Sequence, residues 1–236
     1  MLLACDACRS YHVRAHMEPI DISRTESGFH IEGFPDAVKA IRLSGPVARR
    51  LADLWLHKQD LDFAAECLSD INQVPDVERV RREALWRSAI VHYAKCFGTS
   101  KSRFQLNASK ILRGEPLGLA THKFFTELRD KHVVHDENSY ALCFPGAVLN
   151  RGDKSYKIEK ILCFAGFIQT LNQEHWANLK LLIDKAHAWV ASEFDGICAL
   201  LTKDLEQQTY AVLLARDGMT VRVPSLDEVG RTRDAP

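Results

Sequence analysis

The feature that most constrains the fold is a run of apolar residues at helical spacing that begins after Ser44-Gly45-Pro46. Proline suits the first turn of a helix, because the amide N–H that it lacks would have no intrahelical partner there. From that point apolar side chains recur every three or four residues, the period of one buried helix face: Val47, Leu51, Leu54, Leu61, Ala65, Leu68 and Ile71. The pattern predicts one helix from about residue 46 to 72.

Three further helices follow from the same kind of pattern. One opens at Pro75-Asp76, and its short connection to the first helix predicts an antiparallel pair. Another starts near Ala120, and a long one runs from Asn172 to about Gln207. The expected fold class is therefore mainly α, an antiparallel helical bundle over residues 46–206.

Beta-type sequence is expected in two places. A small hairpin is predicted at about 140–170, where segments rich in Ile, Leu and Phe flank the turn residues Asn150-Arg151-Gly152-Asp153. A C-terminal hairpin and a tail are predicted over residues 207–236. The hairpin strands there are segments 209–214 and 220–223, which flank a turn containing glycine.

Charge and cysteine content place the chain in a broad class. The 31 basic and 31 acidic residues cancel, so that any binding of nucleic acid needs a local patch. Seven scattered cysteines, mostly within apolar runs, are typical of a reducing cytoplasm rather than of a disulfide framework. No stretch approaches the ~18 consecutive apolar residues of a membrane span. We expect a cytoplasmic protein with no membrane partner and no cofactor.

Residues 1–45 form a poorly defined N-terminal extension, in which residues 29–34 are a candidate short strand. A zinc finger places its two pairs of ligands about twelve or more residues apart, so that a hairpin and a helix can fold around the metal. The extension offers two thiolates and two imidazoles at much closer spacing, from Cys5, Cys8, His12 and His16. A zinc site built from these residues therefore stands beside the alternative of a loosely structured start that binds no metal.

The thirty residues from Ala84 to Arg113 contain no aspartate or glutamate, which makes them the one clearly basic region of the chain. Binding to phosphates would explain such a region, and an aromatic ring within it could stack on a base. The candidate RNA-binding residues are Lys101, Arg103, Phe104, Lys110 and Arg113. The alternative is a solvated loop with ordinary basic side chains.

Residues 128–138 gather two histidines, an arginine and several other charged groups at the end of an apolar helix. RNA cleavage without a metal needs a base for the ribose 2′-hydroxyl proton and a cation that stabilises the charge on the phosphate oxygens. Histidine fits the first role because its pKa is near neutrality. Arginine fits the second because its planar fork matches phosphate oxygens. Arg129 and His135 are the candidate pair.

The spacing of this pair sets a geometric condition. Residues six apart on an ideal α-helix point about 120° away from each other. Arg129 and His135 can therefore converge only if the helix tightens or ends near Val134, or if a second subunit completes the site. His132, three residues beyond Arg129, is the closer neighbour on a helix.

The motif Arg129-Asp130-Lys-His-Val-Val-His135 resembles the R-x4-6-H signature of HEPN domains, which stands at the end of a bundle helix. Two following strands and a long closing helix resemble the abortive-infection type of HEPN protein. The resemblance covers roughly residues 46–206, and it is strongest at residues 128–136 and 84–93. One departure is Glu137, at a position where toxins controlled by a nucleotidyltransferase partner often carry tyrosine.

This resemblance implies Arg129 and His135 as the catalytic residues, with Asp130 orienting the arginine. Many HEPN proteins are dimeric, metal-independent ribonucleases that serve as toxins or phage-defence effectors. The resemblance thus implies a homodimer, an RNA substrate and an antitoxin or other regulatory partner.

Two alternatives remain open. Some HEPN domains keep the bundle without activity, so that the chain would be a non-catalytic module for RNA, nucleotides or a protein partner. The residues could also be purely structural, with Arg129 paired to Glu127 or Asp136 and His135 capping a helix end, where a cation is favoured.

Overall fold

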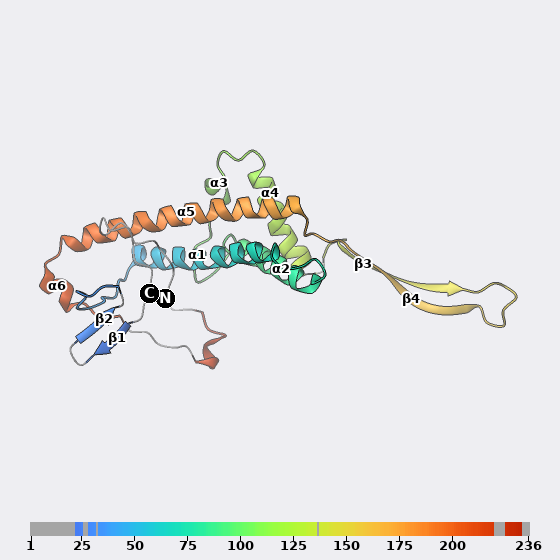
Figure 1. Ribbon diagram of the computed structural model, residues 1–236, viewed down its shortest axis with the longest axis horizontal. Coiled ribbons are helices and arrows are strands. Elements are labelled where there is room, and N and C mark those ends of the chain that lie inside the picture. Colours follow the sequence, from blue (N-terminus) through green and yellow to red (C-terminus); the bar gives the residue numbers. More distant parts are fainter. Residues whose placement is uncertain (1–21, 26–27, 32, 136, 220–224, 233–236) are drawn as a thin grey trace. The chain divides into compact units, whose positions relative to one another are not determined.

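The computed structural model describes residues 22–25, 28–31, 33–135, 137–219 and 225–232 (Figure 1). The chain divides into two compact units. The first comprises Met1–Lys58, Thr99–Phe104 and Ala188–Pro236, and the second comprises Gln59–Gly98 and Gln105–His187. Helix α1 (Pro46–Ile71) and helix α5 (Gln173–Glu206) each contribute residues to both units.

The first unit contains a short hairpin and the beginning of α1. Strands β1 (Ile22–Thr25) and β2 (Gly28–Ile31) pair antiparallel, so that the strand predicted at 29–34 exists but begins and ends earlier. Helix α1 begins directly after Gly45, whose φ of 96° is a conformation that glycine adopts without strain. A short helix α6 (Tyr210–Ala215) and a 3-10 turn at Leu226–Glu228 lie towards the end of the chain.

The predicted C-terminal hairpin is wrong in its first strand, because that segment forms α6. Thr209 precedes this helix with an extended backbone, and its side chain accepts a backbone N–H of the first turn, which is a helix N-cap. Alanine and leucine make up four of the six residues of α6 and favour a helix once it is capped. Gly218, predicted to lie in the turn, forms an antiparallel bridge with Ile41. Segment 220–223 lies outside the described residues.

The second unit contains helices that pack around aromatic side chains, and a hairpin. Helix α2 (Arg79–Lys95), the short α3 (Ala108–Ile111) and α4 (Gly118–Leu128) follow one another, and α4 continues into a π-helix, η2 (Arg129–Val134). The rings of Trp86 in α2 and Phe125 in α4 are both buried and meet edge-on, with their centroids 6.0 Å apart. The helices predicted from the apolar pattern are therefore confirmed, and α3 is an addition.

The antiparallel pairing of the first two helices is confirmed by side-chain contacts within the second unit. Near the start of α2, Arg82 donates to the backbone carbonyl of Ile71, the last residue of α1, at 2.9 Å. Towards the end of α2, His92 and Lys95 each contact the buried carboxylate of Asp60 at 2.8 Å. Residue numbers thus rise along one helix as they fall along the other.

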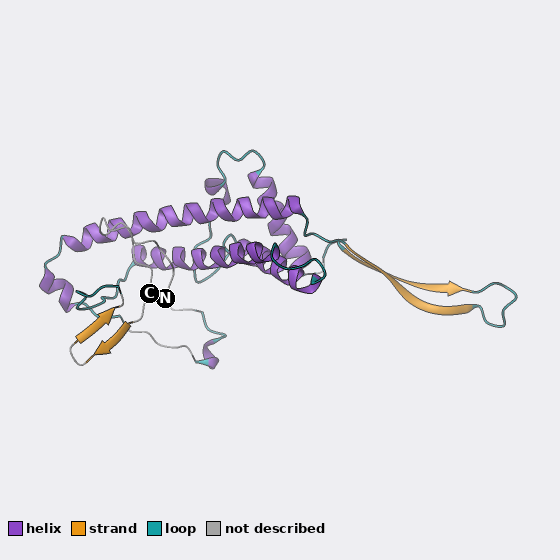
Figure 2. Cartoon of the chain, in the orientation of Figure 1, coloured by secondary structure: helices purple, strands orange, loops and turns teal. Residues whose placement is uncertain are grey.

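The hairpin predicted at about 140–170 is confirmed as strands β3 (Ala141–Leu149) and β4 (Ile158–Phe167), which pair antiparallel (Figure 2). All but three of their nineteen residues are exposed. A hairpin of this kind has no core of its own, which is unusual because an isolated two-stranded sheet is marginally stable in water.

The long closing helix is confirmed as α5, and Gly196 lies inside it without interrupting it. Its start is held in the second unit by Trp176, whose indole N–H donates to the carbonyl of Leu68 at 3.0 Å. Of the helices in the described ranges, none is at once long enough and apolar enough to pass through a bilayer.

We predict that His122 makes folding sensitive to mild acid. Burial lowers the pKa of His122 below its ordinary value of 6.5, and the neutral ring lies 2.9 Å from the hydroxyl of Tyr93. The unfolded chain therefore binds a proton that the folded chain rejects, so that stability falls as the pH drops below about 6.5. Urea unfolding at about pH 7.5 and about pH 5.5 should show this loss, and the loss should be smaller in His122→Gln, whose amide can still bond to Tyr93.

Candidate functional site

The predicted catalytic stretch lies on a π-helix. Helix α4 ends at the buried Leu128, and the chain continues directly into η2 with wider backbone bonding, as in the 3.2 Å bond from the N–H of His135 to the carbonyl of Asp130. π-Helices are rare and are found frequently at functional sites. Apolar periodicity could not have shown this one, because the sequence of the segment is compatible with a continued α-helix.

Arg129 is the first residue of η2, and one of its terminal nitrogens pairs with the carboxylate of the neighbouring Asp130. This is the contact expected if Asp130 orients the arginine. The Nε atom of Arg129 is buried and has no hydrogen-bond partner among the described residues. Asp130 thus orients one end of the Arg129 guanidinium, and the Nε–H of the same group makes no described hydrogen bond.

His132 lies one turn further along η2 and is partly buried. Its ring meets that of Tyr140 edge-on at 5.5 Å between centroids, and its buried Nδ1 has no hydrogen-bond partner in the described part of the chain. Buried polar atoms without partners are uncommon in native proteins. Two of them within four residues distinguish this element from the rest of the second unit.

His135 is the first residue beyond η2 and has an extended backbone, with φ −118° and ψ 148°. It is exposed. The helix thus ends at Val134, which is one of the conditions under which Arg129 and His135 can converge. Among the described residues, no hydrogen bond or ion pair joins the two side chains, so their convergence stays a prediction.

The elements on both sides of this site are fixed by one tryptophan. Besides its contact with Phe125 in α4, Trp86 donates its indole N–H to the hydroxyl of Thr170 at 2.9 Å, and Thr170 is itself buried. Thr170 lies just before α5, after the hairpin. Trp86 therefore holds both ends of the segment 129–169 that contains η2, β3 and β4.

The five candidate RNA-binding residues are divided between the two units. Lys101, Arg103 and Phe104 belong to the first unit, and Lys110 and Arg113 belong to the second. Lys101, Lys110 and Arg113 are exposed, whereas Arg103 and Phe104 are partly buried. Each unit thus presents part of the basic region.

Phe104 has more contacts than a free stacking platform would have. The guanidinium of Arg50 lies 4.5 Å from the centre of its ring, and the ring of His57 meets it edge-on at 5.1 Å. Its backbone N–H donates to Asp53 at 3.2 Å. Its role in base stacking stays a prediction, since a base would need to share the ring with Arg50.

The first unit also has a hollow beside Phe104 that sequence reasoning missed. Its volume is about 360 Å³, and Arg49, Arg50 and Asp53 line it together with the start of α1 at Gly45-Pro46. Arg49 is exposed there. The two arginines precede the stretch without acidic residues, so that the search for a one-signed region did not include them.

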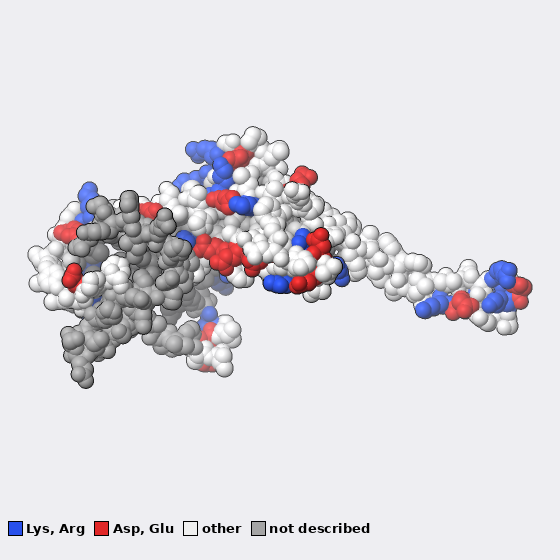
Figure 3. Space-filling model, in the orientation of Figure 1, with Lys and Arg blue, Asp and Glu red and all other residues white. Residues whose placement is uncertain are grey.

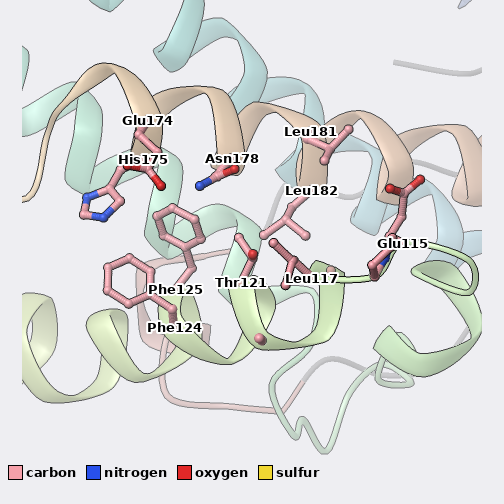
Figure 4. A pocket seen from close by; sticks show the side chains of 13 residues that line it. Glu115, Leu117, Thr121, Phe124, Phe125, Glu174, His175, Asn178, Leu181 and Leu182 are labelled. Atoms are coloured by element: carbon pink, nitrogen blue, oxygen red, sulfur yellow. The ribbon is translucent and has the colours of Figure 1, made fainter.

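A larger hollow of about 610 Å³ lies in the second unit between α4 and the start of α5 (Figure 4). Leu117, Phe124 and Leu182 form apolar parts of its wall, and Glu174 and His175 add polar groups. The Nδ1–H of His175 donates to the carbonyl of Thr170 at 2.7 Å. The hollow is of a size that small ligands occupy, but neither Arg129 nor His135 lines it.

The candidate zinc ligands Cys5, Cys8, His12 and His16 lie outside the described residues. Within the described ranges, no group of three or more His, Cys, Asp or Glu side chains is arranged to hold a metal ion. Comparison of the chain with models of protein families, with curated proteins and with solved structures gives no match.

We predict that the unused bonding capacity in η2 makes Arg129 dispensable for stability. Arg129→Met keeps the length of the side chain and removes the buried Nε–H, so the free energy of unfolding should stay within about 1 kcal/mol of the wild-type value or rise. Arg82→Met is the matched control, because it removes bonds of 2.9 and 2.8 Å to the carbonyls of Ile71 and Val74.

The control should lose about 1–3 kcal/mol, which corresponds to a Tm decrease of roughly 2–4 °C per kcal/mol for a chain of this size. Thermal and urea unfolding measure both variants. An equal loss in Arg129→Met and Arg82→Met would show that Arg129 has stabilising contacts comparable to those of Arg82.

Proposed function

We propose that the protein is a metal-independent endoribonuclease of the HEPN type, with Arg129 and His135 as its catalytic residues and Asp130 as the positioning residue. The observation that carries this proposal is the π-helix that ends at Val134 and releases His135 into an extended backbone. The ion pair between Arg129 and Asp130 supports the same assignment. The helical architecture, with strands between α4 and a long closing helix, agrees with the resemblance to an antiparallel HEPN bundle.

The proposed reaction is an internal transfer of the phosphate ester. Neutral His135 takes the proton of the ribose 2′-hydroxyl, and the 2′-oxygen forms a bond to the adjacent phosphorus. The bond from phosphorus to the 5′-oxygen breaks, that oxygen takes a proton from water, and protonated His135 returns its proton to the hydroxide that remains. Arg129 donates to the non-bridging oxygens as their charge increases. The products are a 2′,3′-cyclic phosphate and a 5′-hydroxyl.

A second candidate function is binding of RNA without cleavage. It is favoured by the absence of any described hydrogen bond that would orient the ring of His135, and by the exposed basic side chains in both units. In that case η2, Lys110 and Arg113 of the second unit bind phosphates, Lys101 of the first unit binds phosphates separately, and no bond is broken. A toxin or phage-defence role with a regulatory partner accompanies the first candidate and not the second.

A cleavage assay with purified protein and single-stranded RNA in the presence of a chelator distinguishes the two candidate functions. We expect products with a cyclic phosphate, identified by mass spectrometry. Arg129→Ala and His135→Ala should each lower the rate by roughly 10²–10⁴-fold, the range that an acid–base or charge-stabilising group contributes.

Lys131→Ala is the matched control for these variants. Lys131 is exposed on η2 between the two residues and takes no part in the proposed reaction. Its variant should cleave at the wild-type rate. Activity that survives in both Arg129→Ala and His135→Ala would refute the assignment, and binding without any cleavage would favour the second candidate.

Phosphate contacts predict a strong salt dependence of RNA binding under either candidate. Using His135→Ala to prevent cleavage, fluorescence anisotropy with a labelled single strand should give a linear decrease of log affinity with log salt. Each phosphate contact contributes a slope of about −0.7 for single strands. Replacing Lys110 and Arg113 by alanine should reduce the slope by roughly 1.4, whereas Lys123→Ala, a lysine paired with Glu127, should leave it unchanged.

A further inference from the structure

The hairpin of β3 and β4 carries apolar side chains on both of its faces. Residues opposite each other in an antiparallel pair share a face, so the register assigns every strand residue to one side. The first face contains Leu142, Phe144, Val148, Leu162 and Phe164. The second face contains Cys143, Pro145, Ile161, Cys163 and Phe167. Sheets with one face in water alternate apolar and polar residues, and this hairpin does not.

Charged residues are confined to the tip of the hairpin. Between Ala141 and Ala147, and between Ile161 and Phe167, neither strand contains a charged residue. Glu159 and Lys160, next to the bulge near the turn, are the charged residues of the two strands. Figure 3 shows the result as an uncoloured arm with blue and red atoms at its end.

The exposed apolar surface of this hairpin is large. The side chains of Phe144, Phe164 and Phe167 are 60%, 59% and 78% exposed, which amounts to roughly 400 Å² for three phenylalanines. Leu142, Leu149 and Ile161 are also exposed. The largest apolar patch of an ordinary monomer is about 300–600 Å², and each partner of a stable complex buries about 800 Å². The three phenylalanines, which lie on two faces, thus expose about half of the roughly 800 Å² that one partner of a stable complex buries, and the other exposed apolar side chains of the hairpin add to this area.

We propose that this hairpin is a self-association arm, which packs face to face and antiparallel on the hairpin of a second copy of the chain. In such a pair the tip of each arm, which is the turn at residues 150–160, lies over the base of the other, where the strands join the helices. The proposal concerns assembly and does not depend on the proposed ribonuclease activity.

Charge supports the antiparallel arrangement of two identical arms. Residues 150–160 at the tip contain four basic and two acidic residues, a net charge of +2. In the sequence, residues 136–140 immediately precede β3 and contain two acidic and no basic residues, a net charge of −2, and Glu137 is exposed. A two-fold axis perpendicular to the strands places each basic tip near the acidic base of its partner. The uncharged middle of the arm brings no like charges together.

The edges of the hairpin favour contact through a face. Proline has no N–H to donate to an added strand, and Pro145 lies in β3. The bulge interrupts β4 near its start. Both features are used by proteins to prevent pairing at sheet edges. An apolar face also has no groups that recognise RNA phosphates, and a bilayer would leave the outward backbone N–H and C=O groups of both strands without partners.

Sedimentation velocity and light scattering of the full chain test the proposal. The wild type should dimerise. Two double variants place charges on one face each, Phe144→Glu with Phe164→Glu, and Ile161→Glu with Phe167→Glu. At least one of them should weaken dimerisation by roughly 100-fold or more, because the dimer would bury unpaired carboxylates. Val77→Glu with Val80→Glu is the matched control on exposed valines outside the hairpin, and it should remain dimeric.

Removal of the arm gives a second measurement that does not depend on these substitutions. The N–H of Ile168 donates to the carbonyl of Tyr140 at 2.8 Å, so the two ends of the arm are adjacent. Residues 141–167 can therefore be replaced by an Asn-Gly turn. The shortened chain should keep the helical circular dichroism of the wild type and be a monomer.

A charge exchange tests the antiparallel arrangement. Lys154→Glu with Lys157→Glu gives residues 150–160 a net charge of −2 and should weaken the dimer, and the further changes Asp136→Lys and Glu137→Lys give residues 136–140 a net charge of +2 and should restore it. A wild type that is monomeric, a dimer that survives in the shortened chain, or a monomer that sediments with lipid vesicles through the hairpin would overturn the proposal. Ribonuclease activity retained by the monomeric variants would leave the proposed function intact.

Discussion

The buried side chain of Trp86 is the contact on which the arrangement of the second unit most depends. Its ring packs against Phe125 on α4, and its indole N–H donates to Thr170 just before α5. A buried indole N–H needs a partner, because leaving it unpaired would cost about 1–3 kcal/mol. One residue of α2 thereby fixes the point at which the chain leaves the helices and the point at which it returns. The forty-odd residues between these points contribute little to the core, which explains how they can depart from regular structure.

Both unusual features of the protein lie in that segment. The π-helix η2 leaves two polar nitrogens buried without described partners, and the hairpin exposes apolar side chains to water. Each feature lowers stability, so neither would be expected in a segment selected for folding alone. The core of the second unit, with Trp86, Tyr93, Phe125 and Leu182 fully or almost fully buried, provides the stability that such a segment lacks. The division suggests that the core helices serve folding and that residues 129–169 serve function.

The sequence predicts the helices well because their signal is an average over many residues. Of the seven apolar positions that predict α1, Leu54, Leu61, Leu68 and Ile71 are buried and Leu51 is partly buried, whereas Val47 and Ala65 are exposed, and the period still identifies the helix. The prediction failed at residues 210–215, where six residues are too few to separate a short helix from a strand and the Thr209 cap decides the outcome. The π-helix was not predictable either, because widening from i→i+4 to i→i+5 bonding leaves the apolar period of the segment unchanged. The sequence identifies the residue types at the candidate site. Whether the side chains of Arg129 and His135 converge depends on differences of a few ångströms in their positions, which the spacing in the sequence does not determine.

For the hairpin, the sequence predicts the strands but not the surface that they contact. Two segments rich in Ile, Leu and Phe around a turn are sufficient to predict the strands. The absence of alternation between apolar and polar residues also indicates that neither face of the hairpin is suited to water. Strands that are apolar on both faces can pack through either face, and the described helices of this chain leave both faces exposed. Strands of nine residues are roughly 30 Å long, so antiparallel arms would hold the two copies of η2, one at each base, about that far apart. Assembly through the arms therefore does not by itself unite two Arg129–His135 pairs in one cleft. If catalysis needs both pairs together, the contact must come from another surface, and if each chain acts alone, His135 must turn towards Arg129 within its own subunit.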